Sequence, residues 1–92
     1  MSDMNQFDSV WDALDDDPIK VKNMKLRSAL MMAVTSRIEE EGLNQTATAK
    51  RLHISQPRVS ALMKGKVGEF RLDTLVNFAH QLGLQVNLSV AA

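Results

Sequence analysis

Apolar residues recur every three to four positions along most of the chain, which is the spacing of one face of an α-helix. This spacing predicts a long helix over about 19–41 and shorter helices over about 45–52, 56–64 and 72–82. The core face of the long helix is expected to comprise Leu26, Leu30, Ala33 or Val34, and Ile38. The last helix is expected to bury Leu72, Leu75, Val76, Ala79 and Leu82. The pattern therefore predicts an all-α domain.

Residues with special backbone preferences mark the ends of these helices. Asn44 and Ser55 each precede a helix, where a side-chain oxygen can accept a hydrogen bond from an unpaired backbone N–H. Glycine readily adopts the left-handed conformation that ends a helix, and three of the expected helices are followed by one. These are Gly42, Gly65 and Gly83.

After Gly83 the period of the pattern changes from that of a helix to that of a strand. Apolar side chains alternate with polar ones up to the end of the chain, so a short β-strand is predicted. A lone strand needs a partner for its backbone hydrogen bonds, and the same strand of a second copy could supply them. The dimerisation residues under this hypothesis are Leu84, Val86, Leu88 and Val90.

Charge is distributed unevenly, although the net charge of the 92 residues is zero. Residues 1–17 contain six aspartates and no base, whereas residues 18–92 contain all 11 bases and five acids. Four apolar residues of the acidic segment have helical spacing, namely Phe7, Val10, Trp11 and Leu14. They could fold back on the chain's own domain or anchor in a groove of a partner protein, and the pattern leaves both alternatives open.

The composition limits the classes of function. A length of 92 residues predicts one domain. The chain has no cysteine and only two histidines, so neither a metal site nor a cofactor is expected. It shows no nucleophile–base pair and no phosphate-binding loop, so we do not expect an enzyme. The acidic start and the lack of a long apolar run predict a cytoplasmic protein that contacts no membrane.

The stretch from Leu43 to Lys66 resembles the helix-turn-helix of the Cro/CI-like (XRE) transcriptional regulators. The resemblance rests on the Asn44-Gln45 start of one helix, Leu52 before a short turn, the Ser55-Gln56 start of the next helix, and the Gly65-Lys66 exit. It covers about residues 24–83 and implies a five-helix DNA-binding domain. One departure is His53, at a position where the family usually has glycine because the backbone turns left-handed there. Histidine can adopt that conformation at some cost in strain.

The same stretch has the charge of a DNA-binding surface, because residues 43–66 hold five bases and no acid. A recognition helix in the major groove presents its N-terminal residues to the base edges. Gln56 can form a bidentate pair with adenine, and Arg58 can contact guanine or a phosphate. The expected DNA-contacting residues are Gln45, Ser55, Gln56, Pro57, Arg58, Ser60, Ala61, Lys64 and Lys66.

The overall layout resembles HigA-type antitoxins of toxin–antitoxin modules. This resemblance implies a homodimer that binds a double-stranded operator, represses its own operon and neutralises a small basic RelE/HigB-like toxin. Two alternatives stay open: a stand-alone XRE-type regulator without a toxin, and a toxin-neutralising module that does not read DNA. Three parts are expected: an acidic segment at 1–17, a DNA-binding domain at 18–83 and a dimerisation strand at 84–92.

Overall fold

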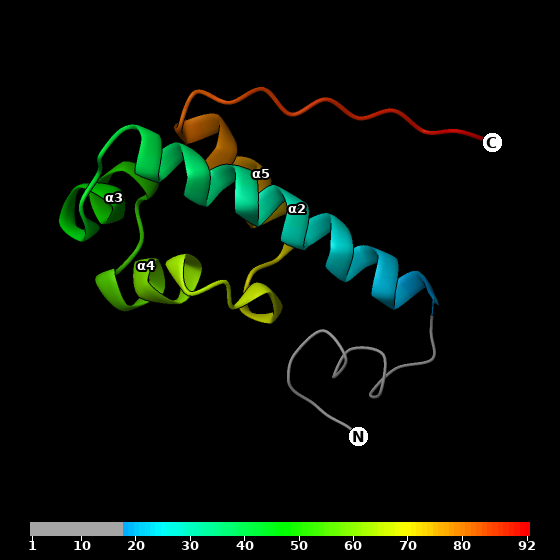
Figure 1. The fold of residues 1–92 in the computed structure, drawn as a ribbon, viewed down its shortest axis with the longest axis horizontal. Coiled ribbons are helices and arrows are strands. Elements are labelled where there is room, and N and C mark those ends of the chain that lie inside the picture. The colour runs from blue at the N-terminus through cyan, green and yellow to red at the C-terminus, as the bar shows by residue number, and fades with distance from the viewer. Residues whose placement is uncertain (1–17) are drawn as a thin grey trace, which may run out of the picture.

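The computed structural model describes residues 18–92, which form four α-helices and one short 3₁₀-helix. The elements are α2 (Pro18–Glu40), α3 (Gln45–Leu52), α4 (Gln56–Met63), η1 (Val67–Glu69) and α5 (Leu72–Gln81). The long helix α2 runs the length of the molecule, with α5 packed along it and with α3 and α4 at its C-terminal half (Figure 1). The all-α class is therefore confirmed, but the expected five-helix domain is wrong, because residues 18–92 form four α-helices.

The fully buried residues of α2 all lie in its C-terminal half. Met31, Val34 and Ile38 are buried there, one helical turn apart from one another. Leu26 was predicted on the same face, but it is 61% exposed. In this part of α2 the covered face runs through Met24, which packs against the core, and Arg27, which bonds the carbonyl of Phe70. Spacing within one helix identifies possible buried stripes, and the packing of the neighbouring elements decides which stripe is covered.

Two phenylalanines form the aromatic centre of the core. The rings of Phe70 and Phe78 meet edge to face with their centroids 6.1 Å apart. Both are buried, as are Leu75, Ala79 and Leu82. The core predicted for the last helix was right for these three residues, but it included Leu72, which is 38% exposed, and Val76, which is half-buried. Phe70 was not predicted in the core, because it follows η1 in a segment where the helical period is interrupted.

Side-chain caps start α3 and α4 as the sequence predicts. Asn44 Oδ1 accepts a hydrogen bond from the backbone N–H of Ala47 at 2.8 Å. Ser55 Oγ accepts one from the backbone N–H of Arg58 at 3.3 Å, and Pro57 occupies the first turn of α4. Each cap satisfies one of the donors that the first turn of a helix leaves unpaired.

All four helices end in a left-handed residue, and at the end of α3 that residue is His53. Its φ of 58° and ψ of 45° lie in the left-handed region, which the glycines after the other three helices also occupy. The next N–H, of Ile54, donates to the carbonyl of Ala49 at 3.0 Å, and Leu84 makes the equivalent bond to Ala79 at 2.9 Å. This is the Schellman arrangement, in which an apolar residue after the turn packs back on the helix, as Ile54 and Leu84 do on the core.

The C-terminal segment is not a β-strand, contrary to the prediction. Residues 18–92 contain no strand, and the chain after Gly83 is an extended segment without ladder partners. It leaves α5 and diverges from α2 toward the C-terminus (Figure 1), with Leu84 half-buried and Leu88 and Val90 exposed by 88% and 86%. Alternation of apolar and polar residues favours an extended backbone, but a strand also requires a second extended segment alongside it, and the described residues contain none.

Within residues 18–92, no helix has the length and apolar character needed to cross a membrane.

The strained turn at His53 leads to a prediction about stability. Replacing His53 by glycine removes the left-handed strain of a side-chain-bearing residue, so we expect a free energy of unfolding higher by about 0.5 kcal/mol after the entropy cost of glycine. The matched control is His80→Gly, which places glycine inside α5 at an exposed histidine and is expected to lower the stability by a few tenths of a kcal/mol, roughly. Urea unfolding followed by circular dichroism measures both changes. If both variants change the free energy of unfolding in the same direction, His53 is not strained in the wild type.

Candidate nucleic-acid interface

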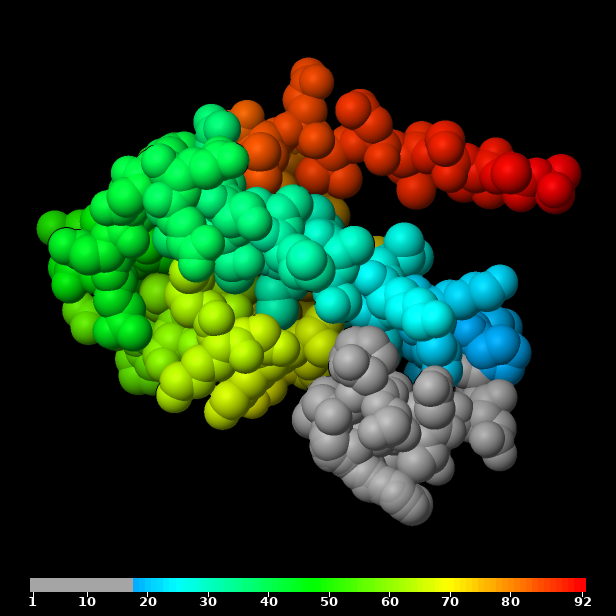
Figure 2. All heavy atoms as spheres, in the orientation of Figure 1, coloured from blue at the N-terminus to red at the C-terminus, as the bar shows by residue number. Residues whose placement is uncertain are grey.

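Helices α3 and α4 form a helix-turn-helix whose second helix presents its N-terminus to solvent. The two helices pack against each other and are joined by the three residues 53–55. Val59 and Leu62 anchor α4 in the core, so the opposite face of the helix points outward. In the space-filling view the α4–η1 region lies at the surface, on the side of α2 away from the C-terminal segment (Figure 2).

The residues at the start of α4 have the exposure that base contacts require. Ser55, Gln56 and Pro57 are exposed, while Arg58 and Ser60 are half-buried. Ala61 was also predicted to contact DNA, but it is half-buried and packs against the core. The outward face of α4 therefore begins with the Ser55–Arg58 stretch.

A side-chain hydrogen bond joins the two helices at this face. Gln56 Nε2 donates to Oγ1 of Thr46 at 3.3 Å, and both residues are exposed. Gln45, the first residue of α3, is exposed beside Thr46 in sequence, at a helix terminus whose dipole attracts anions. Gln45 and Gln56, both predicted to contact DNA, thus lie at the N-termini of α3 and α4, which this hydrogen bond joins.

Arg58 is held against the body of the domain. Its guanidinium carbon lies 4.2 Å from the centre of the Phe70 ring, the geometry of a cation–π contact. Its Nη1 also donates to the backbone carbonyl of Glu69 at 3.0 Å. The side chain is therefore fixed by the segment that connects α4 to α5.

The bases of the helix-turn-helix do not all serve the same surface. Lys64 and Lys66, which follow α4, and Lys50 on α3 are exposed. Arg51 instead donates through Nη1 to Glu41 at 3.1 Å and through Nε to the carbonyl of Gln81 at 2.8 Å. Arg51 therefore links α3 to the ends of α2 and α5 and stabilises the fold. The number of bases in residues 43–66 gave no sign that this one has a structural role.

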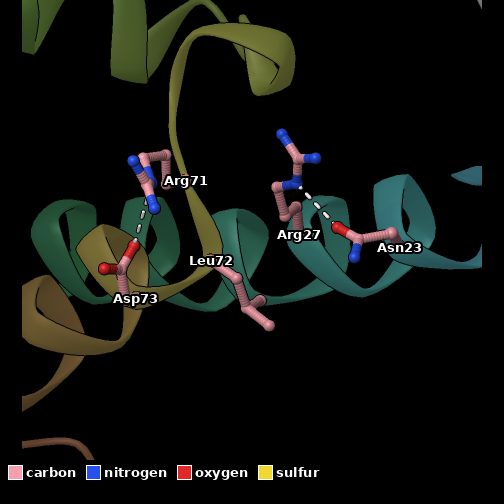
Figure 3. A pocket seen from close by; sticks show the side chains of 5 residues that line it. All are labelled: Asn23, Arg27, Arg71, Leu72 and Asp73. Carbon is pink, nitrogen blue, oxygen red and sulfur yellow. Dashed lines mark hydrogen bonds and ion pairs between the residues drawn. The ribbon is translucent and has the colours of Figure 1, made fainter.

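A shallow pocket of about 390 Å³ lies between α2 and the start of α5. In the close-up, Arg27 extends from α2 beside Asn23, and Arg71 bends toward Asp73 at the start of α5 (Figure 3). Arg27 Nε donates to Asn23 Oδ1 at 3.0 Å, and Arg71 Nε lies 3.6 Å from Asp73 Oδ1, so both cations already have partners. No group of three potential metal-ligating side chains occurs in residues 18–92.

Two sets of predicted residues lie apart from this interface. The partner-binding residues Phe7, Val10, Trp11 and Leu14 lie outside the described residues. The dimerisation set Leu84, Val86, Leu88 and Val90 lies along the extended C-terminal segment, on the other side of α2 (Figure 2).

The sequence analysis missed two residues that position the expected DNA contacts. Thr46 accepts a hydrogen bond from Gln56, and Phe70 stacks with Arg58. Thr46 is an ordinary helix-start residue, and no sequence signal distinguishes its hydroxyl as a partner for Gln56. Phe70 offered one signal, because it is a large aromatic residue in the short connecting segment between Lys66 and Arg71. Such a residue in a connecting segment usually anchors it to the core.

The fold and the exposed helix start define the class of helix-turn-helix proteins, which the comparison with known families supports. A family model described as a helix-turn-helix domain matches residues 13–91, nearly the whole chain. The chain belongs to this helix-turn-helix family, which makes it a DNA-binding regulator by class. No curated protein matches the sequence.

Proposed function

We propose that this protein is a sequence-specific transcriptional repressor that acts as a homodimer. The observation that carries the proposal is Gln56, which stands exposed at the first position of α4 on a helix-turn-helix without acidic residues. The major groove is wide enough for an α-helix, and a glutamine amide can pair with both N6 and N7 of adenine. The bond that Gln56 Nε2 donates to Thr46 leaves the second amide hydrogen and the carbonyl oxygen of Gln56 available for that pair.

The surrounding residues supply the contacts that orient α4 on the duplex. Exposed Lys64 and Lys66 are proposed to bind backbone phosphates, as is Gln45 at the N-terminus of α3. Ser55, Pro57 and Ser60 are proposed to line the groove beside Gln56. Phosphate contacts set the position of the helix, and base contacts select the sequence.

The apolar C-terminal segment supports the homodimer. Val86, Leu88 and Val90 are exposed large hydrophobic side chains within five residues, and Leu84 continues the set toward the core. Burying such side chains against a second copy would remove their apolar surface from water. Two copies so joined would place their recognition helices on half-sites about 34 Å apart, or a multiple of that distance.

The finer proposal is that the protein is the antitoxin of a toxin–antitoxin module and represses its own operon. Its support is the resemblance to HigA-type antitoxins and the six aspartates of residues 1–17, whose charge complements a small basic RelE/HigB-like toxin. The four apolar residues of that segment would provide anchors, with Trp11 as the largest. The competing function is a stand-alone XRE-type regulator without a toxin. In that case the acidic segment would fold back on the chain's own domain and bind no partner.

The first prediction concerns base recognition by Gln56. Gln56→Ala should weaken binding to a duplex selected by the wild-type protein from a random pool by about tenfold or more, because a bidentate pair contributes roughly 1–3 kcal/mol. Gln81→Ala is the control, an exposed glutamine at the end of α5. Gel-shift titration measures the affinities, and circular dichroism checks folding. Equal affinity of Gln56→Ala and wild type would remove the recognition role of α4.

The second prediction concerns the C-terminal segment. Replacing Leu88 and Val90 together by serine should shift a homodimer toward monomer, because it removes the two most exposed apolar side chains of the segment. The control replaces their polar neighbours Asn87 and Ser89 by alanine. Light scattering over a range of concentrations gives the mass. A dimer that persists unchanged in the Leu88/Val90 variant would show that this segment does not form the interface.

The third prediction separates the antitoxin from the stand-alone regulator. Deleting residues 1–17 should abolish binding to the product of an adjacent gene encoding a small basic protein, while binding to the selected duplex persists. Co-purification and gel shift on the same deletion measure the two activities. If the variant without residues 1–17 still binds the basic protein, the acidic segment is not the element that binds it.

A further inference from the structure

Arg58 could serve either of two purposes in a DNA complex. An arginine that reads guanine directs two N–H groups at O6 and N7 on the groove floor. An arginine that binds a phosphate lies at the groove wall and carries no sequence information. The contacts of Arg58 in the structure distinguish these purposes, and the inference drawn from them rests on the DNA binding proposed above.

The guanidinium of Arg58 lies toward the flank of α4. It stacks 4.2 Å above the ring of Phe70, and Phe70 is only 1% exposed. Its Nη1 donates at 3.0 Å to the carbonyl of Glu69, at the end of η1. The side chain therefore follows the body of the domain, whereas a base reader extends away from the body into the groove.

The ring that supports Arg58 is itself fixed. Phe70 packs edge to face on Phe78, with ring centroids 6.1 Å apart and planes at 67°. Its backbone carbonyl accepts a hydrogen bond from Nη1 of Arg27 at 3.4 Å, which links it to α2. Phe78 therefore fixes the ring of Phe70, and the Arg27 bond fixes its backbone. A ring fixed in this way restricts the guanidinium plane stacked on it before any DNA is bound.

The charge of Arg58 is nevertheless available. None of the ion pairs formed within residues 18–92 includes Arg58, and its contact with Glu69 uses the backbone carbonyl. A guanidinium has five N–H donors, so most of them remain after the single bond to Glu69. Arginine binds phosphate oxygens through such a planar edge.

We propose that Arg58 is a phosphate-binding residue that contributes affinity without base preference, and that Phe70 is the positioning residue that orients it. Gln56 is then the base-reading residue of the pair, although the two side chains are only two positions apart on α4. The ligand is the phosphodiester backbone of a duplex at the edge of the groove that α4 enters.

The experiment selects duplexes from a pool with a random central region, using the full-length wild type, Arg58→Ala, Arg58→Lys and Gln56→Ala. We expect Arg58→Ala to enrich the same sequence as wild type while binding the selected and unrelated duplexes about tenfold more weakly. The slope of log K against log salt should become shallower by about 0.9 for each phosphate that the variant no longer neutralises. Arg58→Lys should keep most of the slope, because the charge remains, and should recover part of the affinity. Gln56→Ala should instead relax the enriched sequence and leave the slope unchanged.

A double-mutant cycle tests the role of Phe70. Phe70→Leu keeps an apolar side chain in the core but removes the ring face, and we expect it to weaken binding to all duplexes in the wild-type background. In the Arg58→Ala background the same replacement should change DNA affinity little, because there is no guanidinium left to orient. Circular dichroism of each variant separates this effect from unfolding. If Phe70→Leu does not fold, the Arg58 variants still test the phosphate-binding role, because they leave the core unchanged.

The outcomes are distinguishable. Loss of base preference at one position in Arg58→Ala, with an unchanged salt slope, would overturn the assignment and make Arg58 a base reader. Equal effects of Phe70→Leu in both backgrounds would overturn the positioning role. A wild-type protein that enriches no sequence and binds no duplex would refute the proposed function itself, independently of how Arg58 is oriented.

Discussion

The arrangement of α3 and α4 depends on the left-handed backbone at His53. The chain has three residues in which to end one helix and start the next, and the positive φ of His53 allows the N–H of Ile54 to reach the carbonyl of Ala49. Ser55 then caps α4 immediately. This turn sets the angle at which α4 leaves α3, and that angle brings Gln56 within hydrogen-bond distance of Thr46. The strain of a histidine in this conformation is the cost of the geometry, since a β-carbon disfavours the left-handed region.

The exposed face of α4 is supported by the same core that holds the domain together. Phe70 packs on Phe78 inside the molecule and carries Arg58 on its other side. Val59 and Leu62 anchor the inner face of α4. A change in the core is therefore transmitted to the orientation of side chains that are proposed to meet DNA. The interface is preorganised to that extent, which lowers the entropy cost of binding.

The proposed activities occupy separate parts of the chain. The helix-turn-helix and the C-terminal segment lie on opposite sides of α2 (Figure 2), and the acidic residues 1–17 precede that helix in the sequence. The excess of bases in residues 18–92 is matched by the aspartates of the first 17 residues, so the net charge of zero conceals two regions of opposite sign. Such a division would allow one chain to contact a polyanion and a basic protein through different surfaces.

The sequence by itself determined the features that depend on neighbours a few residues apart. The caps at Asn44 and Ser55, the helix ends at the three glycines and His53, and the bounds of α3 all follow from local hydrogen bonds and backbone preferences. Tertiary structure alone decided that Leu26 is exposed, that Arg51 pairs with Glu41, and that Phe70 supports Arg58. It also decided that the alternating C-terminal residues form no strand among those described. Burial and pairing of this kind join elements distant in the chain, so they depend on how the helices pack and not on the period of any one of them.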